Sequence, residues 1–384
     1  MNTTYTATCI MLLIFIASAF SVELALSAAI IEIAVGVIAG NFLGLGSAPW
    51  MDFLAGFGGI LLTFLAGAEV DSRMLRDKLK ESLLIGGLSF IIPYIAAIVY
   101  CYWGAGWTLN ASLIAGCALS TTSLAVVYAV LVETGLTNTD IGKIIMAATF
   151  VTDFGVAAAL SLSFAEYNFY TLWFILGSIA IIAAAARWLP DIFLRYGKRV
   201  IEPEIKLLFF LLFSFMSLAQ MGKGHAVLPV FILGLYLGKM FREHKDLQQK
   251  LRIVAFAMIT PFFFIKSGMN VSLREVAAQW PLFLALFGIK IAAKFVGVWP
   301  LAKRYVAEHA EYTTLLMSTG LTFGTISSLY GLQAGYIDKK QFSVLVAVVI
   351  GTAIVPTFIA QRWFSPNLSK AEADELLARE EESA

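Results

Sequence analysis

The apolar residues of this chain gather in about thirteen long runs, which short polar or charged loops separate. Each run approaches the ~20 residues that an α-helix needs to cross the ~30 Å hydrocarbon core of a membrane. The first stretch, from 6 to 41, is too long for one crossing and therefore predicts two helices. The runs lie at 6–21, 25–41, 52–69, 83–101, 110–132, 141–164, 169–189, 204–221, 226–241, 252–270, 281–301, 312–335 and 341–363. We expect an all-α polytopic membrane protein with about 13 transmembrane helices.

Composition supports this fold class and excludes several functions. Hydrophobic residues make up 59% of the chain and charged residues 14%, with a mean hydropathy of +0.82, whereas about a quarter of a soluble domain is charged. Cys9, Cys101 and Cys117 form no CxxC pair, so we expect neither a disulfide framework nor a metal cluster. The sequence contains no nucleotide-binding, metalloprotease or serine-hydrolase motif. We therefore expect no enzyme, no cofactor and no nucleic-acid partner.

The distribution of basic residues predicts the orientation of the chain in the membrane. When alternate loops are assigned to one side, that side holds 20 of the 27 Lys and Arg residues, and the opposite loops hold four. Because short cytoplasmic loops carry the excess of basic residues, this bias places the N-terminus outside and the C-terminus in the cytoplasm. We expect a multi-pass protein of the cell (inner) membrane in contact with the lipid bilayer, with residues 365–384 as a short acidic cytoplasmic tail.

Four charged residues fall deepest within the apolar runs: Glu32, Asp153, Lys290 and Lys294. An ionised side chain at the bilayer centre costs roughly 2.5 to 3.5 kcal/mol on insertion scales and is kept only beside a partner or a wet cavity. Asp153 and Lys294 fall near the middle of helices that run in opposite directions, so this acid and this base can meet. Three structural alternatives stay open: a fixed salt bridge at Asp153, Lys290 as a balancing charge, and Glu32 as a packing residue.

The surroundings of Asp153 favour an ion site over a fixed salt bridge. Thr149, Thr152 and Ser161 supply hydroxyl oxygens on the same predicted helix, and oxygen is the ligand that hard cations prefer. Asp153 is therefore the predicted cation and proton ligand, with Thr152 beside it. Lys266, in contrast, is expected near a helix end with its amine extended to the membrane surface.

Two of the predicted spans are interrupted by hydroxyl and glycine clusters at corresponding places in the two halves of the chain. They are "GCALSTTSLAVVYAVL" (116–131) and "LLMSTGLTFGTISSLYG" (315–331). Paired interrupted spans indicate inverted repeats with two crossing discontinuous helices, whose ends and unwound carbonyls face an ion near the midplane. Close packing through small residues is the alternative. The predicted oxygen donors are Ser120, Thr121, Thr122, Ser123, Ser318, Thr319 and Thr322.

In the order in which they occur, four further segments resemble one known family. The segments are "IIEIAVGVIAGN" (30–41), "LTFLAGAEVD" (62–71), "PFFFIKSGMNVSL" (261–273) and "IAAKFVG" (291–297). They resemble motifs of the monovalent cation/proton antiporters, in the branch that includes the NapA sodium/proton antiporters and the membrane domains of the Kef potassium efflux systems. The resemblance implies that Lys294, not Lys290, is the transport lysine.

The resemblance also implies a domain organisation and a partner. It places an antiporter domain at 1–364, with core helices around 52–164 and 252–335 that carry the site and a dimerisation domain in the remainder. A homodimer follows from that arrangement. The chain departs from the pattern at several positions. Thr152 replaces the first of two adjacent Asp residues of the acidic helix, Asn41 replaces a Pro, the turn before that helix lacks its usual Pro, and Gly320 and Thr322 stand where an Arg and a Glu are common.

These residues predict a transporter that exchanges Na⁺ or K⁺ for H⁺. A single buried carboxylate binds either a proton or a cation, so the two compete for Asp153. Thr152 and the oxygens of the broken helices complete the cation shell, Lys294 stabilises the empty site, and Glu32 is a supporting charge. Sodium-coupled symport of an organic anion and a non-transporting membrane sensor remain as alternatives.

Overall fold

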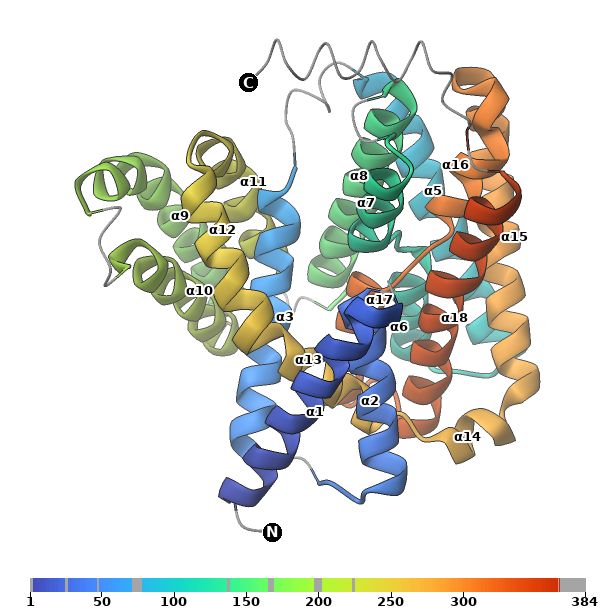
Figure 1. Ribbon diagram of the computed structural model, residues 1–384, viewed down its shortest axis with the longest axis horizontal. Helices are drawn as coiled ribbons and strands as arrows, with labels where there is room; N and C mark the ends of the chain where they lie inside the picture. Colours follow the sequence, from blue (N-terminus) through green and yellow to red (C-terminus); the bar gives the residue numbers. More distant parts are fainter. Residues whose placement is uncertain are drawn as a thin grey trace. The chain divides into compact units, whose positions relative to one another are not determined.

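The structure, a computed structural model, describes residues 3–24, 27–46, 48–70, 78–136, 139–164, 169–196, 202–222, 225–364 and 366. Every regular element in this part of the chain is helical (Figure 1). Asp71 and the predicted acidic tail, apart from Pro366, lie outside the described residues. The α-helices are α1 (Thr3–Leu24), α2 (Ala28–Phe42), α3 (Pro49–Ala68), α5 (Leu79–Val99), α6 (Leu109–Ser120), α7 (Leu124–Glu133), α8 (Asp140–Ser163), α9 (Phe169–Tyr196), α10 (Pro203–Met221), α11 (Val227–Glu243), α12 (Lys245–Val254), α13 (Thr260–Asn270), α14 (Leu273–Ala278), α15 (Trp280–Tyr305), α16 (Ala310–Met317), α17 (Thr322–Gln333) and α18 (Lys339–Trp363).

The helices have the length and composition of membrane spans, which confirms a multi-pass helical membrane protein. Within the described residues, ten helical segments are long and apolar enough to cross a bilayer, and α2 is a shorter apolar helix. The first apolar stretch forms two helices, α1 and α2, as its length predicts. The total of about 13 transmembrane helices and the inverted repeats stay predictions.

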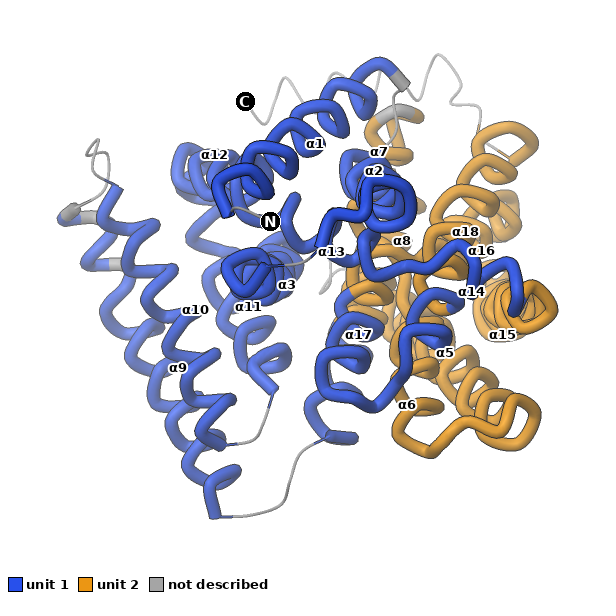
Figure 2. The backbone as a smooth tube through the Cα atoms, turned by 90° about the horizontal axis from the view of Figure 1, so that it is seen from below, with its two compact units in different colours: residues 1–71, 154–279, 326–344 blue, residues 72–153, 280–325, 345–384 orange. Residues whose placement is uncertain are grey.

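By their packing the helices form two units (Figure 2). The first comprises residues 1–71, 154–279 and 326–344, and the second comprises residues 72–153, 280–325 and 345–384. α8, α17 and α18 contribute residues to both units. The expected division into core and dimerisation domains stays a prediction.

Glycines bring the helices of the first unit into close contact. α13 packs against both α2 and α3. A Cβ added to Gly268 of α13 would overlap the carbonyl oxygen of Ile33 in α2, and one added to Gly36 would overlap that of Ile265. Small residues at such contacts let two backbones approach closely, which is how membrane helices commonly associate.

Lys266 of α13 differs from its predicted position at a membrane surface. Its side chain is buried, 7% exposed, and its Nζ forms an ion pair with Asp52 of α3. The expectation of an extended amine is wrong because this half-exposed carboxylate, far away in the sequence, lies beside the lysine.

The second unit is built around α5, which packs against both α6 and α15, while α15 packs against α16. Gly86 of α5 faces the Ala148 carbonyl and the Val151 side chain of α8. Gly297 of α15 faces the carbonyl of Leu88 in α5, 2.8 Å from the position of its missing Cβ. These contacts hold α5, α8 and α15 together, and all three carry predicted site residues or their partners.

Candidate functional site: two broken helices and a buried lysine pair

The two interrupted spans are broken helices, as their hydroxyl and glycine clusters predict. α6 ends at Ser120 and α7 begins at Leu124. α16 ends at Met317 and α17 begins at Thr322. We call 121–123 the first break and 318–321 the second break. Both breaks belong to the second unit.

Two hydrogen bonds join the breaks to each other. The hydroxyl of Thr122 donates to the carbonyl oxygen of Met317 at 2.9 Å, and the amide of Ser123 donates to Oγ1 of Thr319 at 3.3 Å. Residues almost 200 positions apart in the chain therefore lie side by side. That the two breaks form one ion site stays a prediction.

Most of the predicted oxygen donors are buried at these breaks. Several hydroxyls donate to backbone carbonyls of their own helices, such as Ser318 to Thr314 at 2.7 Å and Thr319 to Leu316 at 2.8 Å. Thr121 Oγ1 and Ser123 Oγ, in contrast, make no hydrogen bond within the described part of the chain. The donors buried at 0–1% exposure are Ser120, Thr121, Thr122, Ser123, Ser318 and Thr319, while Thr322 is half-buried.

Lys294 is held at the first break by three hydrogen bonds. Its Nζ, on α15, donates to Ser89 Oγ of α5 at 2.8 Å, to the Ser120 carbonyl at 2.9 Å and to Thr122 Oγ1 at 3.0 Å. An ammonium group has three donors, so all of them are used. The side chain is fully buried. Lys294 therefore links α5, α15 and the carboxyl end of α6, where the helix dipole favours a cation.

Lys290, one turn earlier on α15, reaches the second break instead. Its side chain is also fully buried, and its Nζ makes no hydrogen bond within the described residues. A Cβ added to Gly320 would overlap this Nζ, and Thr121 Oγ1 lies 3.0 Å from the same Cβ position. The sequence shows that the two lysines share a helix face, but it does not show that they serve different breaks.

Asp153, on α8, lies in the electrostatic environment of this lysine pair. Asp153 is 2% exposed and attracts the Lys294 ammonium, and Lys290 repels that same ammonium. The predicted direct pairing of Asp153 with Lys294 is not what the hydrogen bonds show, since the lysine donates to two hydroxyls and a carbonyl. Thr152 is buried beside the acid, and its hydroxyl donates to the Thr149 carbonyl at 2.7 Å.

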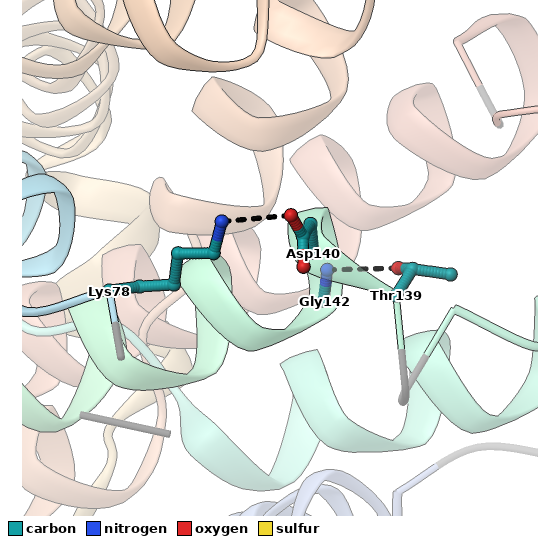
Figure 3. A network of polar contacts seen from close by, with 4 residues as sticks. All are labelled: Lys78, Thr139, Asp140 and Gly142. Carbon is teal, nitrogen blue, oxygen red and sulfur yellow. Dashed lines mark hydrogen bonds and ion pairs between the residues drawn. The ribbon is translucent and has the colours of Figure 1, made fainter. Parts of the chain in front are cut away.

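The start of α8 fixes the helix that carries Asp153 (Figure 3). Thr139 Oγ1 accepts a hydrogen bond from the Gly142 amide at 3.1 Å, which satisfies one of the free amides of the first turn. Asp140 pairs with Lys78 at 2.8 Å, and Lys78 immediately precedes α5. An acid in the first turn also complements the helix dipole. The beginnings of α5 and α8 are therefore tied together.

Two other residues from the sequence analysis belong to the first unit. Glu32 is buried in the middle of α2, 4% exposed, and makes no hydrogen bond or ion pair within the described residues. Ser161 Oγ accepts a hydrogen bond from the Leu228 amide at 3.3 Å. The supporting role of Glu32 stays a prediction.

Comparisons with known proteins agree with this arrangement. A family model described as "Sodium/hydrogen exchanger, transmembrane" matches residues 10–365. A probable Na⁺/H⁺ antiporter 3 of Methanocaldococcus jannaschii is 26% identical over 335 residues, which cover 83% of this chain and 85% of that protein. The Na⁺/H⁺-K⁺ antiporter GerN of Bacillus cereus is 24% identical over 363 residues, covering 88% of this chain and 90% of that protein. The solved structure of the sodium proton antiporter MjNhaP1 from Methanocaldococcus jannaschii matches with a TM-score of 0.70 at 14% identity, covering 95% of this chain and 100% of that chain, so the two share a fold.

Proposed function

The chain belongs to the sodium/hydrogen exchanger family of transmembrane proteins, and from this premise we propose that it exchanges Na⁺ or K⁺ for protons at Asp153. The main support for this proposal is the position of the Asp153 carboxylate. Among the described residues of the second unit it is the one fully buried acid, and it lies close enough to attract the lysine that holds the first break.

Exchange follows from the charge of a single buried carboxylate. An ionised Asp153 is costly in a low-dielectric interior, and either a proton or a metal cation neutralises it. If the site changes its exposure only when it is neutralised, each proton that enters on one side is matched by a cation that leaves on the other. Lys294 stabilises the empty, charged site because its ammonium is fixed nearby by three hydrogen bonds.

The broken helices provide oxygen ligands for the cation. Thr121 Oγ1 and Ser123 Oγ are buried and make no hydrogen bond within the described part of the chain, so their lone pairs are available. Thr152 Oγ1 donates its proton to a backbone carbonyl and keeps its acceptor capacity. Together with the Asp153 carboxylate, these hydroxyls form the coordination shell of the cation.

Ion choice, orientation and assembly follow the sequence expectations. We propose Na⁺ as the preferred ion with K⁺ as a second substrate, and the name of the Bacillus cereus relative covers both ions. We place the protein in the cell (inner) membrane with its N-terminus outside and its C-terminus in the cytoplasm, on the basis of the basic-residue bias. A homodimer is proposed from the family resemblance alone.

The test is ion-driven proton movement in proteoliposomes that contain the purified protein. After a pH gradient is imposed, addition of Na⁺, Li⁺ or K⁺ should dissipate it with the wild-type protein and not with Asp153→Asn. Asp140→Asn is the matched control, because Asp140 lies on the same helix but is 72% exposed. Cation-driven dissipation that survives in Asp153→Asn would remove Asp153 from the mechanism.

A further inference from the structure

The two buried lysines of α15 differ in how firmly each is held. Lys294 has three acceptors within 3.0 Å, whereas Lys290 Nζ has none within the described residues. A buried amine without a hydrogen bond is costly to keep in place. The Lys290 amine has no hydrogen bond to lose when it moves, whereas that of Lys294 would lose three.

Lys290 Nζ nevertheless lies at a place suited to a cation. α16 ends at Met317, whose carbonyl accepts a hydrogen bond from Thr122, and a helix carboxyl end carries roughly half a negative elementary charge. Thr121 Oγ1 adds a buried oxygen, 3.0 Å from the position that a Gly320 Cβ would take. Partial negative charge and free oxygen lone pairs are what a monovalent metal ion requires.

We propose that the second break is a subsite for the transported cation and that the Lys290 amine is a tethered occupant which must leave before the ion enters. This inference rests on the proposed function, since the competing ion is the one that is exchanged. The amine excludes the ion by its volume and, when protonated, by its charge. Lys290 is therefore a specificity-determining residue that sets the apparent affinity for the cation and the discrimination between cations of different size.

Gly320 provides a second, independent way to disturb the same position. Any side chain at Gly320 would overlap Lys290 Nζ, so only glycine leaves room for the amine. Gly320→Ala displaces the amine but puts a methyl group in the same place, whereas Lys290→Met removes the amine and keeps a long apolar stem. The two variants therefore compare a filled second break with a vacated one.

The experiment measures the apparent KM for Na⁺, Li⁺ and K⁺ from dissipation of an imposed pH gradient in proteoliposomes. Lys290→Met should lower the KM for Na⁺ by at least roughly tenfold, because the ion no longer competes with a tethered charge for the second break. Gly320→Ala should instead raise the KM for Na⁺, because its methyl group takes up the space that the ion enters, and both variants should change the Na⁺ to K⁺ ratio. The matched control is Gly288→Ala, also on α15, where an added Cβ meets open space and no change is expected.

The outcomes separate this inference from the proposed function. If the wild type exchanges cations but Lys290→Met keeps or raises the KM for Na⁺, the tethered-amine inference is overturned. It is overturned likewise if Gly320→Ala keeps or lowers that KM. If the wild type itself moves no protons in response to any of the three cations, the proposed function fails. Because a purely structural lysine would change stability but not the ratio between cations, thermal unfolding of each variant in detergent is measured alongside.

Discussion

The hydroxyl of Thr122 donates to the carbonyl oxygen of Met317 at 2.9 Å and accepts a hydrogen bond from Lys294 Nζ at 3.0 Å. One side chain of the first break thereby holds both the end of α16 and the lysine of α15. The three elements form one polar junction inside an apolar unit, where a lost hydrogen bond has no water to replace it.

Replacing Thr122 by Val should therefore loosen the junction. Val keeps the shape of Thr but leaves the Met317 carbonyl and one Lys294 donor without this partner, so we expect the free energy of unfolding to fall by roughly 1–3 kcal/mol. Thermal unfolding in detergent measures the change, and the exchange rate in proteoliposomes should fall with it. Thr122→Ser keeps the hydroxyl and should stay close to wild type. Equal melting temperatures for the Val and Ser variants would show that the hydrogen bonds of the Thr122 hydroxyl do not stabilise the protein.

Removal of the Lys294 amine should abolish exchange. In Lys294→Met the Ser120 carbonyl loses its donor, and the empty Asp153 loses the ammonium that attracts it. We expect no measurable dissipation of a pH gradient on addition of Na⁺ or K⁺. Ser89→Ala is the control, because it removes only one of the three acceptors; it should cost roughly 1.5–3 kcal/mol of stability but retain measurable exchange. A Lys294→Met variant that exchanges at the wild-type rate would be incompatible with its proposed role.

Close packing in the first unit predicts a contrast between two glycines. Gly268→Ala forces a methyl group into the Ile33 carbonyl, and overpacking of this kind costs roughly 1–3 kcal/mol. Gly56→Ala, on α3 of the same unit, adds its methyl to open space and should leave the melting temperature unchanged or slightly raised. The comparison of melting temperatures in one detergent checks this. Equal melting temperatures for the two variants would show that the contact between α13 and α2 does not depend on Gly268.

Much of this fold follows from local patterns in the sequence. Apolar runs near the length of a membrane crossing predict the spans. Hydroxyl and glycine clusters predict the breaks, and these lie after Ser120 and after Met317. Such features are readable because each depends on residues close together in the chain.

The partners of long side chains were not predictable in the same way. Lys266 pairs with Asp52, which is 214 residues away, and no local pattern links them. The sequence predicts that Lys294 meets Asp153, and the structure shows an attraction between them, but the acceptors of the lysine on α5 and at the first break are not predictable from it. Gly320 was noted only as a departure from a family pattern, although its missing side chain leaves the space that Lys290 Nζ uses. A lysine has four rotatable bonds, so only the packing around it decides where the amine lies.

A half-buried histidine in the first unit predicts how stability depends on pH. His225 lies in the connection before α11, donates to the Phe164 backbone and is 2.8 Å from the Tyr330 hydroxyl through Nε2. With one ring nitrogen donating to a carbonyl, the other accepts from the tyrosine, which is the arrangement of a neutral imidazole.

Burial holds the pKa of His225 below its usual value of 6.5. The unfolded chain therefore binds a proton at a higher pH than the folded chain does, so the stability that His225 contributes is present above about pH 6.5 and is lost as the pH falls below it. Melting temperatures of the wild type should decrease between about pH 7.5 and pH 5.5. The decrease in melting temperature should be smaller in His225→Gln than in the wild type. It should be unchanged in His244→Gln, which replaces an exposed ring. A decrease of the same size in wild type and His225→Gln would show that other groups cause the pH dependence.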